Sequence, residues 1–282
     1  MSVDETPEPT KASSRGAFLR TAAVASAGVA GLGALPAIAQ AGGPWRDPWH
    51  RRPPAPPSSG LTEGDIAILA AASIAEALAV TTYTSIINTA PFFANLPDDD
   101  QNYLVAARQE EMSHYALEIS VTKKPSPFGT FYYPPNMFTD AQTTLNTLVT
   151  LEDAFIAAYL VGVRYFSTAD LRVTAARIMG IESDHRTLAR VLGGDVAPAD
   201  GGPLTAITGF QGVAESIDPP NNNAYERTLG LTNIDQAVSA LLPFADDVSA
   251  KAAGFDVTRP YTFVPFTPTA PIDLGDFHGF AG

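Results

Sequence analysis

The sequence predicts an all-α protein, a bundle of four helices with one long crossover, followed by a C-terminal extension that contains a fifth helix. Three observations predict this fold. Residues 61–193 hold four long, capped segments with apolar residues at helical spacing; a connection rich in Pro, Gly and aromatic residues divides them into two pairs; and the second and fourth segments each carry a Glu-x-x-His unit, Glu111/His114 and Glu182/His185. Of the 282 residues 45% are hydrophobic, which is enough apolar surface for a core.

Residues 1–39 have the layout of a secretory signal peptide, with a polar start, a run of small apolar residues and an Ala-Ile-Ala cleavage site that ends at Ala39. The start resembles a twin-arginine export signal, but Gly16 stands where the second arginine belongs, so the general secretory route stays open. A membrane anchor is the alternative, because the apolar run is about long enough to span a bilayer. We expect cleavage, no stable membrane span afterwards, and a periplasmic or extracellular product.

The remaining N-terminal segment, residues 40–60, is dense in Pro and Gly and is predicted to be an extended linker. The first helix of the bundle should then run from about Thr62 to Thr89, since Thr62 followed by Asp65 has the spacing of a capping box. The second helix should begin at an acidic run that starts at Asp98, where acids favour a helix N-terminus, and end near Lys124.

The connection from Pro125 to Phe138 is too long for a tight turn between helices and is predicted to cross over the bundle. Thr139 and Gln142 have capping-box spacing and should open the third helix. Ser167 or Thr168 should cap the fourth helix, which is expected to stop at the glycine pair 193–194.

The extension, residues 194–282, changes to a composition rich in Gly, Pro and Asn. One further helix is expected from about Asn233 to Ala250, with Asn233 as its cap and Gln236 as the cap's partner. From Thr258 the chain alternates prolines with aromatic residues, which predicts a strap packed on the bundle or on a partner subunit. A homo-oligomer is therefore left open.

Two glutamates lie in apolar helical surroundings. The neighbours of Glu76 at helical spacing are small or apolar, and those of Glu152 are apolar throughout, so each carboxylate needs a partner or a metal ion to be stable there. Tyr83 follows Glu76 by seven residues, as Tyr159 follows Glu152. This repeat indicates that the two helix pairs are two copies of one hairpin. Both tyrosines are interpreted as core aromatics rather than redox relays.

Glu and His three residues apart lie on the same face of a helix, so each Glu-x-x-His unit can aim a carboxylate and an imidazole at one target. The chain has no cysteine, which excludes disulfides, Fe–S clusters and thiolate zinc sites and leaves carboxylate and imidazole as metal ligands. The formal charge of −13 argues against nucleic acid as a partner. The candidate metal ligands are Glu76, Glu111, His114, Glu152, Glu182 and His185.

Three alternatives stay open for these residues. Glu110 could replace Glu111, because it lies four residues before His114 on the same helix. Asp184 and Glu118 could accept a hydrogen bond from a ligand histidine or simply face solvent. The bundle could also be metal-free, with its buried acids held by arginine; the arginines considered are Arg108, Arg164 and Arg186.

One Glu on each of two helices and Glu-x-x-His on each of the other two is the ligand pattern of ferritin-like dinuclear proteins. From Leu61 to Leu192 the chain resembles the ferritin-like superfamily, and more closely its exported bacterial branch, which is related to plant desiccation-associated proteins. The resemblance implies two iron ions, with manganese as the alternative, bridged by Glu111 and Glu182. Glu76 and Glu152 would then be terminal ligands, and each histidine would hold one ion.

The resemblance also implies two classes of function. The first is an oxidoreductase that reacts with O2 or peroxide, or oxidises Fe(II), in protection against stress. The second is a non-catalytic protective protein in which the metal holds the bundle together or is buffered by it.

Overall fold

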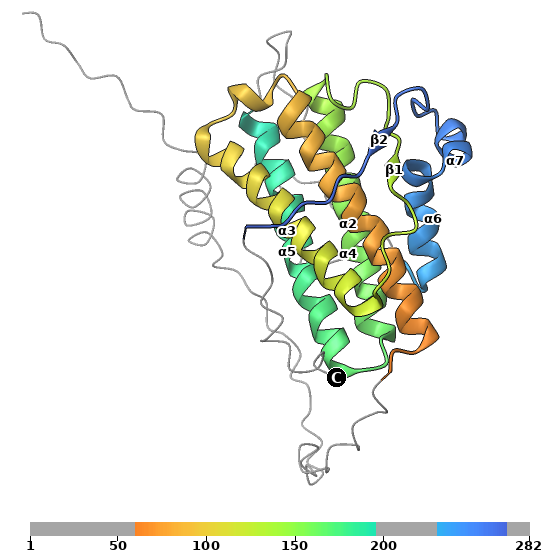
Figure 1. Ribbon diagram of the computed structural model, residues 1–282. Helices are drawn as coiled ribbons and strands as arrows, with labels where there is room; N and C mark the ends of the chain where they lie inside the picture. The colour runs from red at the N-terminus through yellow and green to blue at the C-terminus, as the bar shows by residue number, and fades with distance from the viewer. Residues whose placement is uncertain (1–59, 196–229, 270–282) are drawn as a thin grey trace, which may run out of the picture. The chain divides into compact units, whose positions relative to one another are not determined.

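The computed structural model describes residues 60–195 and 230–269 of the chain (Figure 1). The expected signal peptide, nearly all of the linker, and the parts of the extension at 196–229 and 270–282 lie outside these residues. Four long helices form the bundle: α2 (Glu63–Thr89), α3 (Asp98–Thr122), α4 (Ala141–Tyr165) and α5 (Ala169–Asp195). The predicted all-α bundle is confirmed, and α5 extends one residue past the glycine pair at which it was expected to stop.

The order of contacts along the helices explains the long crossover. Tyr83 on α2 donates a hydrogen bond to Glu152 on α4, whereas Glu76, earlier on α2, accepts one from Tyr159, later on α4. The two helices are therefore antiparallel, and α4 must begin at the end of the bundle where α3 begins. For this reason the α3–α4 connection returns along the length of the bundle (Figure 1).

Part of this connection pairs with the C-terminal extension, which was not predicted. Strand β1 (Thr130–Phe131) forms an antiparallel ladder with β2 (Tyr261–Thr262). Tyr132 N also donates to Phe244 O at 2.8 Å. Backbone hydrogen bonds thus hold the crossover between the bundle and the extension. They give partners to backbone N–H and C=O groups that would otherwise be buried without one.

The predicted cap of the third helix is wrong by one residue. Asp140, not Thr139, is the N-cap of α4, and its carboxylate accepts a hydrogen bond from Thr143 N at 2.8 Å. Gln142 donates to Asn146, one turn further along the helix, at 3.0 Å. Aspartate is among the strongest N-cap residues, so it takes the position from the neighbouring threonine.

Asp65 ties the start of α2 to the turn between α4 and α5. It forms the predicted capping box with Thr62 and also accepts hydrogen bonds from Ser167 N at 2.8 Å and Ser167 Oγ at 2.6 Å. Partial burial raises the pKa of Asp65, but the hydrogen bonds from Ser167 and Thr62 lower it by a larger amount, so the net shift is downward. Thr168 therefore remains to cap α5, and its hydroxyl accepts from Leu171 N at 3.2 Å.

The prediction of a single fifth helix is also wrong. Two helices, α6 (Ile234–Ala245) and α7 (Asp247–Ala252), meet at Asp246. Asp246 has an extended backbone, with φ −121° and ψ 127°, and its carboxylate accepts from Ser249 N at 2.8 Å. Its side chain offers the backbone a cap, and this competes with continuation of the helix. The predicted cap of the first of the two helices, Asn233, is confirmed.

The described part of the aromatic tail packs on the bundle. Phe263 lies edge to face on Tyr115 of α3 with the ring centroids 4.8 Å apart, and Arg108 lies over the ring of Phe266 at 5.5 Å. The side chain of Gln109 accepts a hydrogen bond from Thr269 N at 3.0 Å. The strap therefore follows the outer face of α3.

Helices α2 and α4 are long and apolar enough to cross a membrane. Most of the apolar surface of each is buried inside the bundle, and each carries one buried glutamate, Glu76 or Glu152. Their composition is that of core helices.

Candidate metal centre

A layer of acidic and imidazole side chains crosses the middle of the bundle. It lies between an apolar cluster that contains Leu78, Leu148 and Phe155 and a second that contains Leu69, Leu117 and Ile178. Helices α2 and α4 each contribute one glutamate, and α3 and α5 each contribute a glutamate and a histidine, as the sequence predicts. The structure brings all six candidates together with no more than 4% of any of them exposed; they are Glu76, Glu111, His114, Glu152, Glu182 and His185.

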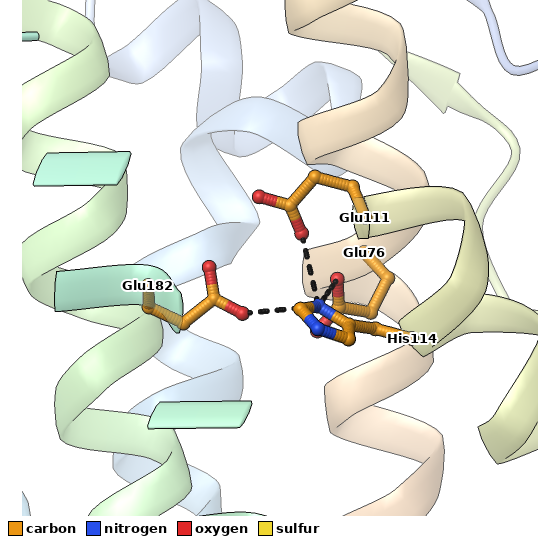
Figure 2. Close-up of side chains that lie close together, drawn as sticks. All are labelled: Glu76, Glu111, His114 and Glu182. Carbon is orange, nitrogen blue, oxygen red and sulfur yellow. Dashed lines mark ion pairs between the residues drawn. The ribbon is translucent and has the colours of Figure 1, made fainter. Parts of the chain in front are cut away.

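The six side chains form two overlapping groups of four, and within each group one ligand atom per residue lies within 4.8 Å of the others. The first group is Glu76, Glu111, His114 and Glu182, and Figure 2 shows the three carboxylates facing the imidazole. The second group is Glu111, Glu152, Glu182 and His185. Two glutamates, one from α3 and one from α5, belong to both groups.

The two shared glutamates each divide their oxygens between the two histidines. Glu111 presents Oε2 to His114 Nδ1 at 3.5 Å and Oε1 to His185 Nδ1 at 2.8 Å. Glu182 presents Oε1 to His114 Nδ1 at 3.4 Å and Oε2 to His185 Nδ1 at 3.5 Å. A carboxylate that faces two positions with different oxygens is placed to bridge two ions.

Although several of them lie within ion-pair distance of one another, eight buried ligand atoms in this layer form no hydrogen bond of suitable geometry within the described ranges. They are Oε2 of Glu76, both oxygens of Glu111, Nδ1 of His114, Oε2 of Glu152, both oxygens of Glu182 and Nδ1 of His185. Buried polar atoms without partners are unfavourable and call for an explanation such as a bound ion. Carboxylate oxygens and imidazole nitrogens that converge in this way fit divalent iron or manganese.

Arginine does not hold these acids. In the described part of the chain, the ion pairs of the six side chains join them to one another and to Glu110. Arg186 pairs instead with Asp153 at 2.8 Å, and Arg164 lies over the ring of Tyr165. The alternative of a metal-free bundle with arginine partners for its buried acids is not what the structure shows.

A comparison with known protein families finds a match for the bundle. The family model of the ferritin-like domain matches residues 64–194, which contain all four bundle helices and all six candidate ligands. Residues 64–194 form a ferritin-like domain. A comparison with curated proteins finds no match to the chain. The resemblance to the ferritin-like superfamily is thus confirmed, while membership of the exported, desiccation-related branch stays a prediction.

Without metal, the ferritin-like domain balances its buried charge with protons. Burial, and then the charge of Glu111, raises the pKa of both Glu76 and Glu152 well above the usual range of a carboxyl. Burial alone would lower the pKa values of His114 and His185, but the facing carboxylates raise both. The charge of His185 in turn lowers the pKa of Glu111, against the effect of burial. These shifts favour protonated imidazoles and neutral terminal carboxyls in the metal-free site.

Metal binding is therefore expected to release protons and to tighten as pH rises through the neutral range. The ligands must lose their protons to bind an ion, and all four raised pKa values keep protons on the metal-free site. Calorimetric titration with Mn(II) at several pH values, in two buffers of different protonation enthalpy, measures the release. Glu152→Gln removes one titrating group and should release fewer protons. A pH-independent affinity with no proton release would contradict this charge assignment.

The tyrosines do more than fill the core of the ferritin-like domain. Tyr83 donates a hydrogen bond to Glu152 at 2.7 Å, and Tyr159 donates to Glu76. Each tyrosine thus orients one of the two glutamates that belong to a single group. The spacing of seven residues between Glu and Tyr on both helices indicates these contacts. Because α2 and α4 are antiparallel, the spacing places the tyrosine of each helix beside the glutamate of the other.

Glu110 supports the layer from outside rather than replacing Glu111. Its Oε2 lies 2.9 Å from Nε2 of His185, so the opposite ring nitrogen, Nδ1, faces the layer. Asp184, one of the two expected acceptors, is exposed instead. Glu118, the other, is buried and accepts from Tyr159 at 2.8 Å. A carboxylate on the outer nitrogen fixes the tautomer and orientation of a ligand histidine and makes it more basic.

Glu110→Gln is expected to lower the affinity of the site for the ion beside His185 by about 10- to 100-fold, the usual effect of losing a carboxylate that orients a ligand histidine. Competition of Mn(II) with a fluorescent chelator measures the affinity of each ion. Asp184→Asn, an exposed change of the same kind beside the same histidine, is the control and should have no effect. Equal losses in the two variants would indicate a general charge effect and not a positioning role for Glu110.

Proposed function

We propose that the ferritin-like domain binds two iron ions, with manganese as the alternative, and reacts with O2 or peroxide, or oxidises Fe(II), in protection against stress. One observation carries the proposal: Glu111 and Glu182 each turn one oxygen towards His114 and the other towards His185. This is what two bridging carboxylates between two ions require.

The charges and donor types of the layer support the same assignment. Four carboxylates match the charge of two divalent ions, and oxygen with imidazole donors suits iron and manganese. Two bound Fe(II) ions would supply the two electrons that, with two protons, reduce one peroxide molecule to two waters. Glu76 and Glu152 would each hold one ion, with the tyrosines orienting them, and the apolar clusters on both sides exclude bulk water from the reaction.

A non-catalytic role is the second candidate. All six side chains are almost completely buried, as expected also for ions that only hold four helices together. Metal analysis of the purified full chain, with absorption spectra before and after addition of O2 and of peroxide, separates the two. We expect about two iron ions per chain and a spectral change on oxidation. Bound metal without any such change would support the structural role, and protein that binds neither iron nor manganese would contradict both.

We also propose that the protein is exported. The support is the Ala-Ile-Ala site that ends at Ala39 after a small-apolar run. N-terminal sequencing of protein from its native host should then return a chain that starts near Gln40. A native protein that starts at Met1 or Ser2 would rule out cleavage.

A further inference from the structure

A cavity lies on one side of the metal layer, inside the bundle. Its volume is about 30 Å³, and all four bundle helices contribute to its wall. All of the side chains that line it are apolar except Glu118, Tyr159 and Thr174. Since one water molecule needs roughly 10–15 Å³ of such space, a molecule of two heavy atoms fits.

The cavity exists because the two hairpins of the bundle differ in side-chain size. Alignment of the hairpins on their ligands, Glu76 with Glu152 and Glu111 with Glu182, shows where they differ. The cavity residues Ala72, Ala75 and Ala175 correspond to Leu148, Leu151 and Leu104 in the other half. These three leucines are at most 1% exposed and fill the equivalent space. Short side chains at these three positions therefore leave room beside the layer, where leucines stand at the equivalent positions of the other half.

A second difference between the halves lies at the inner end of the cavity. Glu118 lines the cavity, is only 2% exposed, and corresponds to Ala189 in the other hairpin. Its Oε1 accepts from Tyr159 at 2.8 Å, and its Oε2 has no hydrogen-bond partner among the described residues. The Tyr159 hydroxyl is also hydrogen-bonded to Glu76. Because a hydroxyl has a single proton, one of the two carboxyls must supply the proton of the second hydrogen bond; burial raises the pKa of both Glu76 and Glu118. One hydrogen bond thus separates the end of the cavity from a proposed metal ligand.

We propose that this cavity binds dioxygen on its way to the ion position between Glu76 and His114. The inference rests on the proposed function, because that position is the destination of the route. Dioxygen has two atoms and forms only weak hydrogen bonds to water, so it gives up little hydrogen-bond energy when it enters an apolar cavity. Peroxide or water would give up hydrogen bonds to bulk water for a wall that offers three polar side chains. In the opposite half leucines occupy the three equivalent positions, so the route reaches the layer from the side of Ala72.

Xenon binding to the metal-free full chain tests the cavity without any reaction. Xenon is an apolar atom that occupies dry cavities of this kind. A crystal structure under xenon pressure should show xenon between Ala72 and Ile178. Ala72→Leu, which copies Leu148 of the other half, should lose the xenon, and Ile178→Ala, which copies Ala107, should keep it. Ordered water in the cavity of the unaltered protein, with no xenon, would overturn the proposal.

The reaction of the iron-loaded protein with O2 tests the route. Ala72→Leu should bind the same amount of iron and be oxidised about tenfold more slowly, equivalent to about 1.4 kcal/mol in the barrier. Ile178→Ala should not be slower than the unaltered protein, and Thr150→Leu, an exposed change on α4, should equal it. If Ala72→Leu excludes xenon and still reacts at the unaltered rate, dioxygen does not pass through the cavity. Failure of the unaltered protein to bind metal overturns the proposed function and removes the route's destination, whereas bound metal without xenon overturns the cavity assignment alone.

Discussion

Glu182→Gln is expected to reduce the metal content of the protein from two ions towards one or none, whereas Glu152→Gln should remove mainly one ion. Glu182 belongs to both groups of four and faces both histidines, so its loss removes a ligand from each position. Glu152 belongs only to the group that contains His185. Glutamine keeps the volume of the side chain, so the comparison isolates the charge and the ligand oxygen.

Elemental analysis of both variants after reconstitution with Fe(II) or Mn(II), at equal protein concentration, measures the difference. Asp100→Asn is the matched control, because Asp100 is a buried acid on α3 that belongs to neither group. It should keep the metal content of the unaltered protein. If Glu182→Gln and Glu152→Gln lose the same single ion, the bridging role of Glu182 is wrong.

Features formed by residues that are close together in the chain could be predicted from the sequence. A Glu-x-x-His unit on a helix fixes its own geometry, and the two copies indicate four of the candidate ligands. The apolar surroundings of Glu76 and Glu152 indicate the other two. The first helix cap could be read in the same way, because Thr62 and Asp65 are three residues apart. In each case the residues that interact are close in the sequence or related by the repeat.

Contacts between distant segments could not be predicted from these patterns. The hydrogen bonds of Ser167 to Asp65 and of Glu110 to His185 join residues more than 70 positions apart, and no spacing rule links them. The cavity is a similar case, because an alanine in a helix predicts no empty space until its neighbours are known. The helix break at Asp246 was missed for another reason: apolar periodicity continues through it, while the capping side chain that stops the helix is a single residue.

The charges of the metal layer depend on contacts that the sequence does not indicate. Burial, and then the charge of Glu111, raises the pKa of Glu76 and of Glu152, whereas His185 lowers that of Glu111 against the effect of burial. The structure adds that both histidines face the shared carboxylates and that their pKa values are raised. Loss of Glu182 would therefore leave imidazoles short of a partner even without metal. The better test of repulsion is a terminal glutamate.

Glu152→Gln is expected to change the stability of the protein in opposite directions with and without metal. Burial and neighbouring charge raise the pKa of Glu152, so the folded state holds a proton that the unfolded state releases above the ordinary carboxyl pKa. Stability of the metal-free protein is then lost as pH rises from that value towards the raised one. Glutamine mimics the neutral carboxyl without this loss, so in chelator at neutral pH the variant should melt at the same temperature or higher.

With metal the order should reverse, because the unaltered protein gains the binding free energy of an ion that the variant lacks. At a free metal concentration 100 times the dissociation constant this is about 2.7 kcal/mol, which corresponds to a melting temperature roughly 5–10 °C higher for a domain of this size. Calorimetric melting of both proteins in chelator and in Mn(II) gives the test. Asp153→Asn, the next residue along α4, is the control: it weakens the 2.8 Å ion pair with Arg186 and should lower the melting temperature equally in both conditions. If Glu152→Gln behaves like this control, Glu152 holds the fold and not an ion.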